Sequence, residues 1–286
     1  AYKACLKSAN TPGKDNKIRP DVDPYIAKGY IPLGYFAQDF SGDNSVSHAL
    51  EYYVADNALA LLSDKLAQEA KSSAQKAEYQ KYAKEFRKRS KGWRHYYSKE
   101  SGTLRPLNSD GTFLAPFNPK DGADFSNTPG FHEGSAWNYT FYVPHDIEGL
   151  AKAMGGDKAF VAKLQKVFDE GLYDPANEPD IAYPFLFSRF KGEEHRTEKT
   201  VSALLKKYYT TRPDGIPGND DTGVMSAWAV FSMIGMYPDC PGEPQYTLFP
   251  PVFDSVEING KYVIRKDQKI KKHRITHQEF VRDYAK

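Results

Sequence analysis

The chain has 286 residues, 40% of them hydrophobic, which suffices for one large domain or two small ones. Its formal net charge of +2 gives no argument for nucleic acid or an anionic membrane as a partner. No apolar run approaches the roughly 20 residues of a membrane helix, so no membrane span is predicted, and the 20 Tyr and 17 Phe leave many rings for a ligand-facing surface.

The first third of the chain is predicted to hold a long loop and then two long helices. Residues 1–44 are expected to be mostly loop after a short helix over 1–9. Ser45 begins a run whose apolar residues share one helical face: Val46, Leu50, Tyr53, Val54, Ala58, Leu61 and Leu62. A second helix is predicted over 73–98, with Lys, Arg and Glu on a solvated face.

The rest of the chain is predicted to be helical up to its C-terminal segment. Residues 99–134 lack helical periodicity, and loops of this length tend to be functional. Further helices are predicted over 135–154, broken or bent at Pro144, and over 157–170, 180–190, 194–209 and 222–236. Extended segments follow at 246–253, 255–258 and 261–264, and the basic stretch Lys261–Lys272 is expected to be a solvated tail or hairpin. About seven helices with mostly short connections predict a mainly α fold of antiparallel hairpins.

The two cysteines, Cys5 and Cys240, lie far apart and have no metal-binding spacing. We expect two buried free thiols, with a disulfide as the alternative. The first residues, AYKACLKSAN, lack the apolar segment of a signal peptide, and export cannot be inferred from them.

Two adjacent acids, Asp220 and Asp221, lie on a glycine-rich turn within GIPGNDDTGVMSAW, residues 215–228. A turn that aims two carboxylates in front of a buried helix suits a general base or a metal site. The structural alternative is a tight turn in which Asp221 or Thr222 caps the helix, and the segment alone favours it.

A second polar cluster, HEGSAWNY, places Glu133 at the start of a helix and Trp137 one turn later. An acid beside an indole suits a general acid of raised pKa, and Trp137 is a candidate for contact with substrate. The alternative is an N-terminal Glu favoured by the helix dipole.

Two further clusters follow. In VPHD, His145 and Asp146 are candidate substrate-binding residues, although a kinked core helix with a structural His–Asp pair is favoured. In NEPD, Asn177 and Glu178 supply oxygen ligands that suit calcium, although Asn-Glu-Pro is also ordinary chemistry for a helix start.

Several other chemistries lack their motifs. The sequence contains no glycine-rich phosphate loop between a strand and a helix, no HExxH or CxxC motif and no nucleophile elbow. Well-separated acids on a helical assembly fit glycoside hydrolysis by paired carboxylates better than acyl transfer.

Together these clusters resemble glycoside hydrolase family 92, the calcium-dependent exo-α-mannosidases. The resemblance extends to about residue 258 and includes five segments in the same order: RPDVDPYIAKGYIP, SVSHALEYYVADNALA, HEGSAWNYTFYVPHDIEGL, NEPDIAYPFLF and DGIPGNDDTGVMSAWAVFSMIGMYP. It implies an (α/α)6 barrel and cleavage of α-mannosides of N-glycans or mannans with inversion.

The resemblance also implies roles for single residues. Glu133 falls on the family's general acid and Asp221 on its general base, with Asp220 beside it. Asn177 and Glu178 fall on part of the calcium site. Some members carry an acid where this chain has Asn219, and the usual His-Gly before the calcium motif is Pro175-Ala176 here.

The predicted domains are a partial (α/α)6 catalytic domain over 1–245 and, over 246–286, a remnant of β-sandwich strands with a basic tail. Because the family's barrel needs twelve helices, a second chain or the missing N-terminal half is expected to complete it. The family implies a secreted, periplasmic or cell-surface location. The alternatives are a non-catalytic glycan- or protein-binding helical module and a different helical-barrel enzyme such as a lyase.

Overall fold

The computed structural model describes residues 1–35 and 43–286, and the chain forms two compact units. Unit 1 comprises Ala1–Gly156 and unit 2 comprises Asp157–Lys286. Part of the predicted N-terminal loop, residues 36–42, lies outside the described residues. The predicted division into 1–245 and 246–286 concerns evolutionary domains and stays a prediction.

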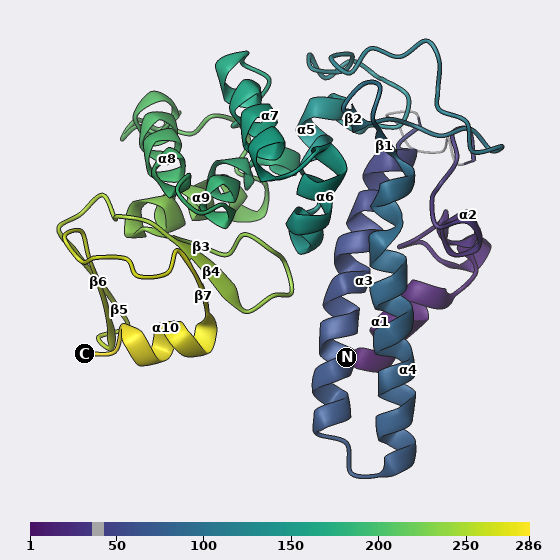
Figure 1. Ribbon diagram of the computed structural model, residues 1–286, viewed down its shortest axis with the longest axis horizontal. Helices are drawn as coiled ribbons and strands as arrows, with labels where there is room; N and C mark the ends of the chain where they lie inside the picture. The colour runs from purple at the N-terminus through teal and green to yellow at the C-terminus, as the bar shows by residue number, and fades with distance from the viewer. Residues whose placement is uncertain (36–42) are drawn as a thin grey trace. The chain divides into compact units, whose positions relative to one another are not determined.

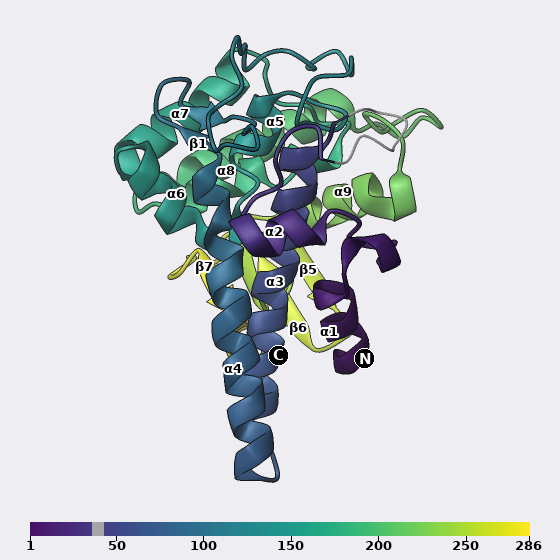
Figure 2. The same cartoon turned by 90° about the vertical axis from the view of Figure 1, so that its right-hand side faces the viewer.

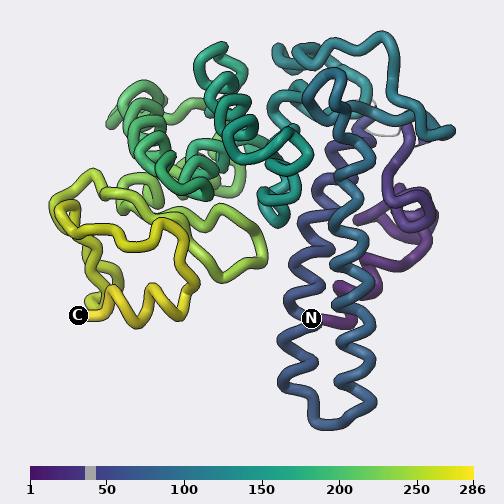
Figure 3. Tube along the Cα trace, in the orientation of Figure 1, coloured from purple at the N-terminus to yellow at the C-terminus, as the bar shows by residue number. Residues whose placement is uncertain are grey.

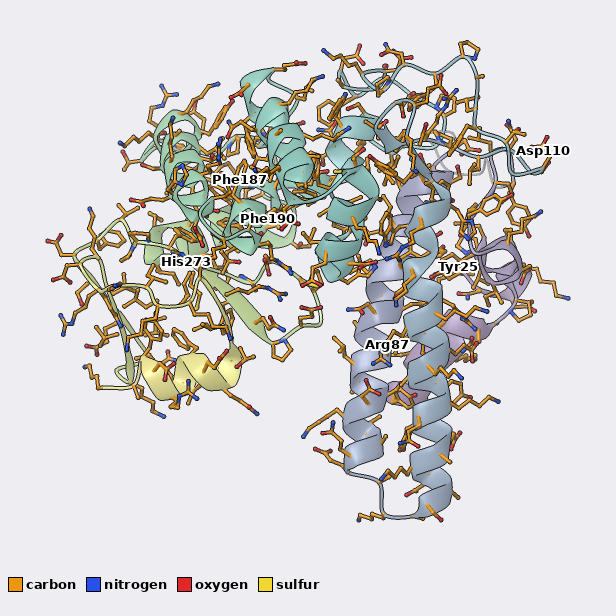
Figure 4. All side chains as sticks on the ribbon, viewed as in Figure 1. Tyr25, Arg87, Asp110, Phe187, Phe190 and His273 are labelled. Carbon is orange, nitrogen blue, oxygen red and sulfur yellow. The ribbon has the colours of Figure 1, made fainter. Side chains whose placement is uncertain are left out.

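Unit 1 is built on a long helical hairpin of α3 (Ser45–Gln68) and α4 (Ser73–Arg89), which lie side by side in Figures 1 and 2. The Ser72 hydroxyl caps α4 by accepting a hydrogen bond from the Gln75 N–H at 3.2 Å. Arg87, labelled in Figure 4, reaches across the hairpin to pair with Asp64. The apolar periodicity that begins at Ser45 therefore predicts α3 correctly.

Two short helices pack on this hairpin, α1 (Tyr2–Asn10) and α2 (Val22–Lys28). The Asp56 carboxylate of α3 accepts hydrogen bonds from the Arg19 guanidinium and the Tyr25 hydroxyl, both at 2.8 Å. Tyr25, labelled in Figure 4, lies on α2, so its hydrogen bond to Asp56 joins α2 to α3. The prediction of a loop up to residue 44 is wrong over α2, whose seven residues are too few to show a helical period.

The remainder of unit 1 consists of short elements. The predicted helix over 73–98 ends early, because α4 gives way to the 3-10 helix η2 (Ser90–His95) and the strand β1 (Tyr97–Ser98), which pairs with β2 (Thr103–Leu104). After the long loop come α5 (Ala136–Thr140), the 3-10 helix η3 (Pro144–Asp146) and α6 (Ile147–Met154). The predicted break at Pro144 is confirmed.

Unit 2 begins with α7 (Asp157–Asp169) and continues through η4 (Glu178–Asp180), η5 (Tyr183–Arg189), α8 (Glu194–Tyr208), η6 (Asp221–Gly223) and α9 (Val224–Ile234). Its core gathers Ile181, Phe185, Val201, Leu204, Met225, Trp228 and Phe249. Phe187 and Phe190, labelled in Figure 4, are buried nearby. The helix predicted over 180–190 is a 3-10 helix with Pro184 near its start.

Short strands and one helix complete unit 2, and Figure 3 traces the path of this part of the chain in light green and yellow. Strands β3 (Met236–Tyr237), β4 (Gln245–Leu248) and β7 (Arg274–Thr276) form an antiparallel sheet in the order β3-β4-β7, and β5 (Ser255–Ile258) pairs with β6 (Tyr262–Arg265). The basic stretch Lys261–Lys272, predicted to be a tail or hairpin, contributes only β6 to a hairpin with β5, and the helix α10 (His277–Asp283) was not predicted. His273, labelled in Figure 4, lies just before β7 and donates a hydrogen bond from its Nδ1 to the Leu248 carbonyl at 3.0 Å.

The described residues contain no helix long and apolar enough to cross a membrane. Both cysteines are free thiols; Cys240 is buried as predicted, whereas Cys5 is exposed on the outer face of α1, so the prediction is wrong there.

Candidate active site

In unit 2 the Asp220 carboxylate is held by the first turn of α9. One oxygen accepts the Ser226 N–H at 2.8 Å, and the other accepts the Ser226 hydroxyl at 2.6 Å. These hydrogen bonds lower the pKa of Asp220. Gly223 occupies the N-cap position of α9, so the predicted capping by Asp221 or Thr222 is wrong, and the Asp220 carboxylate caps the first turn from outside by accepting the Ser226 N–H.

Asp221 has a different environment from its neighbour. Its side chain is exposed, and among the described residues its carboxylate makes no hydrogen bond or ion pair. Thr222 follows with a φ of +54°, a left-handed conformation that is uncommon for a β-branched residue. Strain of this kind concentrates at functional sites, and here it turns the chain so that one acid caps α9 and the next faces solvent.

The turn that carries these acids packs against the loop predicted to bind calcium. A Cβ atom on Gly218 would lie 2.8 Å from the Ala176 Cβ, so only glycine permits this close approach. The Trp228 indole of α9 donates a hydrogen bond to the Ile181 carbonyl at 2.8 Å. Unit 2 therefore brings the Asp220–Asp221 turn and the Asn177–Glu178 loop together.

Tyr209 also belongs to this part of unit 2 and was missed at the level of sequence. Its ring stacks on Trp228 with the centroids 5.3 Å apart. Burial raises the pKa of Tyr209 to about 12, and the charge of Asp220 adds to the effect. A lone tyrosine at the end of a helix gives no sequence signal that it packs beside the Asp220–Asp221 turn.

Asn177 and Glu178 fit a calcium ion as part of its ligand shell. The Asn177 side chain is buried and its Oδ1 accepts the Glu178 N–H at 3.1 Å, which fixes the amide; Glu178 is half-buried. Nearby, the Asp180 carboxylate accepts the Asp174 N–H at 2.9 Å. No group of three or more His, Cys, Asp or Glu side chains suited to a metal is found in the described ranges. Calcium takes six to eight oxygen ligands, so backbone carbonyls, water or sugar hydroxyls would have to supply the rest.

In unit 1, Glu133 lies on a strained turn directly before α5. Its φ is +47°, and 56% of its side chain is exposed. The His132 Nε2 lies 3.7 Å from a Glu133 carboxylate oxygen. Glu133 lies outside the first turn of α5, so the helix dipole does not account for its position.

The peptide before Glu133 is anchored on both sides. The His132 N–H donates to the Ser47 hydroxyl of α3 at 2.9 Å, and the Tyr139 hydroxyl donates to the His132 carbonyl at 2.5 Å. Ser135 and Asn138 form a capping box at the start of α5. The fold therefore holds the backbone while the Glu133 side chain faces solvent.

The three predicted substrate-binding residues of unit 1 are either buried or engaged in contacts within the protein. Trp137 is 4% exposed. The His145 Nε2 lies 2.8 Å from the Ser90 carbonyl. The Asp146 carboxylate accepts hydrogen bonds from the Trp93 indole at 3.0 Å and the Gly149 N–H at 3.2 Å, and it pairs with Arg94 at 2.6 Å. These contacts support the structural interpretation of VPHD, while contact with substrate stays a prediction.

Glu133 belongs to unit 1 and Asp221 to unit 2, so their convergence on one substrate stays a prediction. Each unit supplies one exposed acid on a strained turn, and in unit 2 that acid lies next to candidate calcium ligands. Glycosidases that invert configuration need two such carboxyl groups on opposite faces of the sugar.

The family model for the glycosyl hydrolase family 92 catalytic domain matches residues 1–284 of the chain. The chain belongs to glycosyl hydrolase family 92. A family GH92 α-mannosidase of Bacteroides thetaiotaomicron, solved in complex with mannoimidazole, aligns with a TM-score of 0.80 at 24% identity, covering 98% of this chain and 39% of that one. A family GH92 inverting mannosidase of the same organism aligns with a TM-score of 0.80 at 22% identity, covering 98% of this chain and 41% of that one.

A relative called an uncharacterized secreted glycosidase, from Arthroderma benhamiae, is 28% identical over 284 residues, covering 90% of this chain and 34% of its own length. The chain therefore spans 34–41% of the length of these three proteins. The mainly helical fold is that of the GH92 catalytic domain, which contains an (α/α)6 barrel, as predicted.

Proposed function

We propose that this GH92 chain carries the acid, the base and part of the calcium site of an inverting exo-α-mannosidase that acts on α-mannosides of N-glycans or mannans. The observation that carries the proposal is the contrast between two adjacent acids. Asp220 is fixed by Ser226, whereas the exposed Asp221 carboxylate makes no hydrogen bond or ion pair within the described chain.

In the proposed mechanism Glu133, in its protonated form, donates its proton to the oxygen of the leaving group. Asp221 accepts a proton from the water that attacks the opposite face of the sugar. The two carboxyl groups are expected to lie roughly 6.5–9.5 Å apart, which leaves room for that water. Asp220 keeps the Asp221 backbone in place through its hydrogen bonds to α9.

Asn177 and Glu178 are the residues proposed to hold calcium. When bound, the cation would polarise the hydroxyl groups of the sugar and favour a flattened, oxocarbenium-like ring. Glu178 supplies the carboxylate and Asn177 supplies an oxygen whose orientation the Glu178 N–H fixes. Isothermal titration with calcium tests this assignment, with Glu178→Gln expected to weaken binding and Glu198→Gln, at an exposed position of α8, to leave it unchanged.

The central experiment compares three variants on two aryl α-mannosides, one with a good and one with a poor leaving group. Asp221→Asn is expected to lower kcat about 100- to 10,000-fold on both substrates. Glu133→Gln is expected to lower it by a similar factor on the poor leaving group and far less on the good one, because the latter needs no proton. Asp220→Asn is expected to cost much less than Asp221→Asn.

Product analysis completes the test. The first-formed sugar is expected to be β-mannose, visible by NMR before mutarotation. If both Asp221→Asn and Glu133→Gln retain wild-type rates, the assignment is wrong. Glycan binding without turnover, unaltered by Asp221→Asn, would favour the non-catalytic module, and an unsaturated product would favour a lyase.

Two further parts of the proposal concern the whole protein. Because the chain spans about two fifths of its structural neighbours, completion of the barrel by a second chain or a further N-terminal part is proposed, and light scattering of the purified chain tests it. A secreted, periplasmic or cell-surface location is supported by the relative that is called secreted.

A further inference from the structure

The first turns of α3 contain one exposed acid in an otherwise buried segment. Glu51 is exposed, whereas 44–47, 49–50 and 52–54 are buried. Desolvation nevertheless raises the pKa of Glu51, with hydrogen bonding to Tyr142 and the charge of His48 acting in the opposite direction. Tyr142 and His48 therefore lie close to the Glu51 carboxyl group, although this side chain stays exposed.

Glu51 lies on the part of α3 that also holds the peptide before Glu133. Ser47 and Glu51 are four residues apart on α3 and so share one face, about 6 Å apart along the axis. Ser47 accepts the His132 N–H at one end of the segment that includes α5, and Tyr142 bonds to Glu51 at the other end. The segment from His132 to Tyr142 is therefore fixed to α3 at both ends, with Glu133 near one end and Glu51 at the other.

His48 is a further polar group close to Glu51. Its Nδ1 lies 2.8 Å from Asp21 Oδ2, and Asp21 is buried and also accepts the Tyr52 hydroxyl at 2.6 Å. Asp21, the residue before α2, thus fixes the His48 imidazole. The ring also lies close enough to Glu51 for its positive charge to lower the pKa of that carboxyl group.

We propose that Glu51 is a substrate-binding residue, whose carboxylate accepts hydrogen bonds from hydroxyl groups of the mannose whose glycosidic oxygen Glu133 protonates. This inference rests on the proposed function. Tyr142 orients the carboxylate by donating to one oxygen, which leaves the remaining lone pairs for the ligand. Carboxylates suit this task because sugar hydroxyls are donors and a charge-assisted hydrogen bond is stronger than a neutral one.

The test is a thermodynamic cycle that compares the effect of Glu51→Gln on the parent substrate with its effect on substrates that each lack one hydroxyl group. On an aryl α-mannoside, Glu51→Gln is expected to raise KM about 10- to 100-fold, with a smaller change in kcat. On the 2-, 3-, 4- or 6-deoxy substrate that lacks the contacted hydroxyl, the same substitution is expected to have almost no effect. Far-UV circular dichroism and thermal unfolding check that the variant folds.

Two variants serve as controls. Glu69→Gln neutralises an exposed acid at the far end of the same helix and is expected to leave KM unchanged. Tyr142→Phe keeps the Glu51 carboxylate but removes its orienting hydrogen bond, so a rise in KM smaller than that of Glu51→Gln is expected.

The outcomes separate this inference from the proposed function. If the wild type cleaves α-mannosides and Glu51→Gln has wild-type KM on every substrate, the role of Glu51 is refuted and the function stands. An equal loss on the parent and on all four deoxy substrates would refute the contact and indicate a structural role. If the wild type neither cleaves nor binds α-mannosides, the function and the role of Glu51 both fail.

Discussion

Replacing Trp228 by Phe tests how unit 2 fixes its two candidate loops. Trp228 is 3% exposed, donates to the Ile181 carbonyl and stacks on Tyr209. Phe lacks the N–H, and leaving a buried carbonyl without its donor costs about 1–3 kcal/mol. The smaller ring leaves a cavity and a weaker aromatic contact, each worth on the order of 1 kcal/mol. We therefore expect Trp228→Phe to lower the free energy of unfolding by about 3–5 kcal/mol.

The assay is urea unfolding followed by far-UV circular dichroism, which reports the helices of both units without depending on the replaced indole, so a change that the fluorescence of unit 1 does not share belongs to unit 2. The other two tryptophans, Trp93 and Trp137, lie in unit 1, so their fluorescence gives a separate transition for that unit. Val230→Ala is the matched control, because Val230 lies on the same helix but is 53% exposed, and it should change stability by less than about 0.5 kcal/mol.

A Trp228→Phe variant that unfolds within about 0.5 kcal/mol of the wild type would refute this reasoning. It would mean that the hydrogen bond to Ile181 contributes nothing to stability, and that the Asp220–Asp221 turn and the calcium loop are held together by other contacts. A loss confined to the circular dichroism transition, with unit 1 fluorescence unchanged, would support it most directly.

Three further predictions concern buried charge, thiol reactivity and pH. Asp56→Ala leaves the Arg19 guanidinium buried without its carboxylate and is expected to destabilise the protein by about 3–5 kcal/mol in urea unfolding; a loss below about 1 kcal/mol would contradict this. Cys5 should react quickly with a thiol reagent and Cys240 only after unfolding, because burial raises the pKa of the Cys240 thiol; two fast thiols would refute this. The pKa of Asp220 is lower in the folded protein than in the unfolded chain, so the stability that this carboxylate contributes is present above the unfolded pKa and is lost as pH falls through the folded pKa. Asp220→Asn should therefore flatten the decline in thermal stability between about pH 5 and pH 2. An unchanged slope would show that the hydrogen bonds of this carboxyl group do not stabilise the fold.

Sequence periodicity predicts the long helices because their apolar faces repeat over many turns. The run from Ser45 defines the start of α3, and Pro144 marks the break between α5 and α6. It fails for α2, where Asp23 and Pro24 in a seven-residue helix read as loop. It also fails to separate α from 3-10 geometry in η5, since both present apolar residues at similar intervals.

The motifs identify candidate acids but not their surroundings. Sequence alone gives no way to tell which of Asp220 and Asp221 is engaged, because the partner is a serine six residues later that could equally well face solvent. Glu51 has no signal of its own, since its partner Tyr142 lies on a distant segment that only the fold brings to α3. Contacts of this kind depend on packing, which residue patterns do not encode.

The turn between α3 and α4, residues 69–72, lies at the opposite end of the hairpin from the loop that carries Glu133 (Figure 1). Exposed tips of this kind tolerate added chain well, because no buried backbone has to move. A short affinity peptide inserted there would let the protein be immobilised, and a fluorophore attached there would label it, with Glu51 and Glu133 left accessible to soluble glycans.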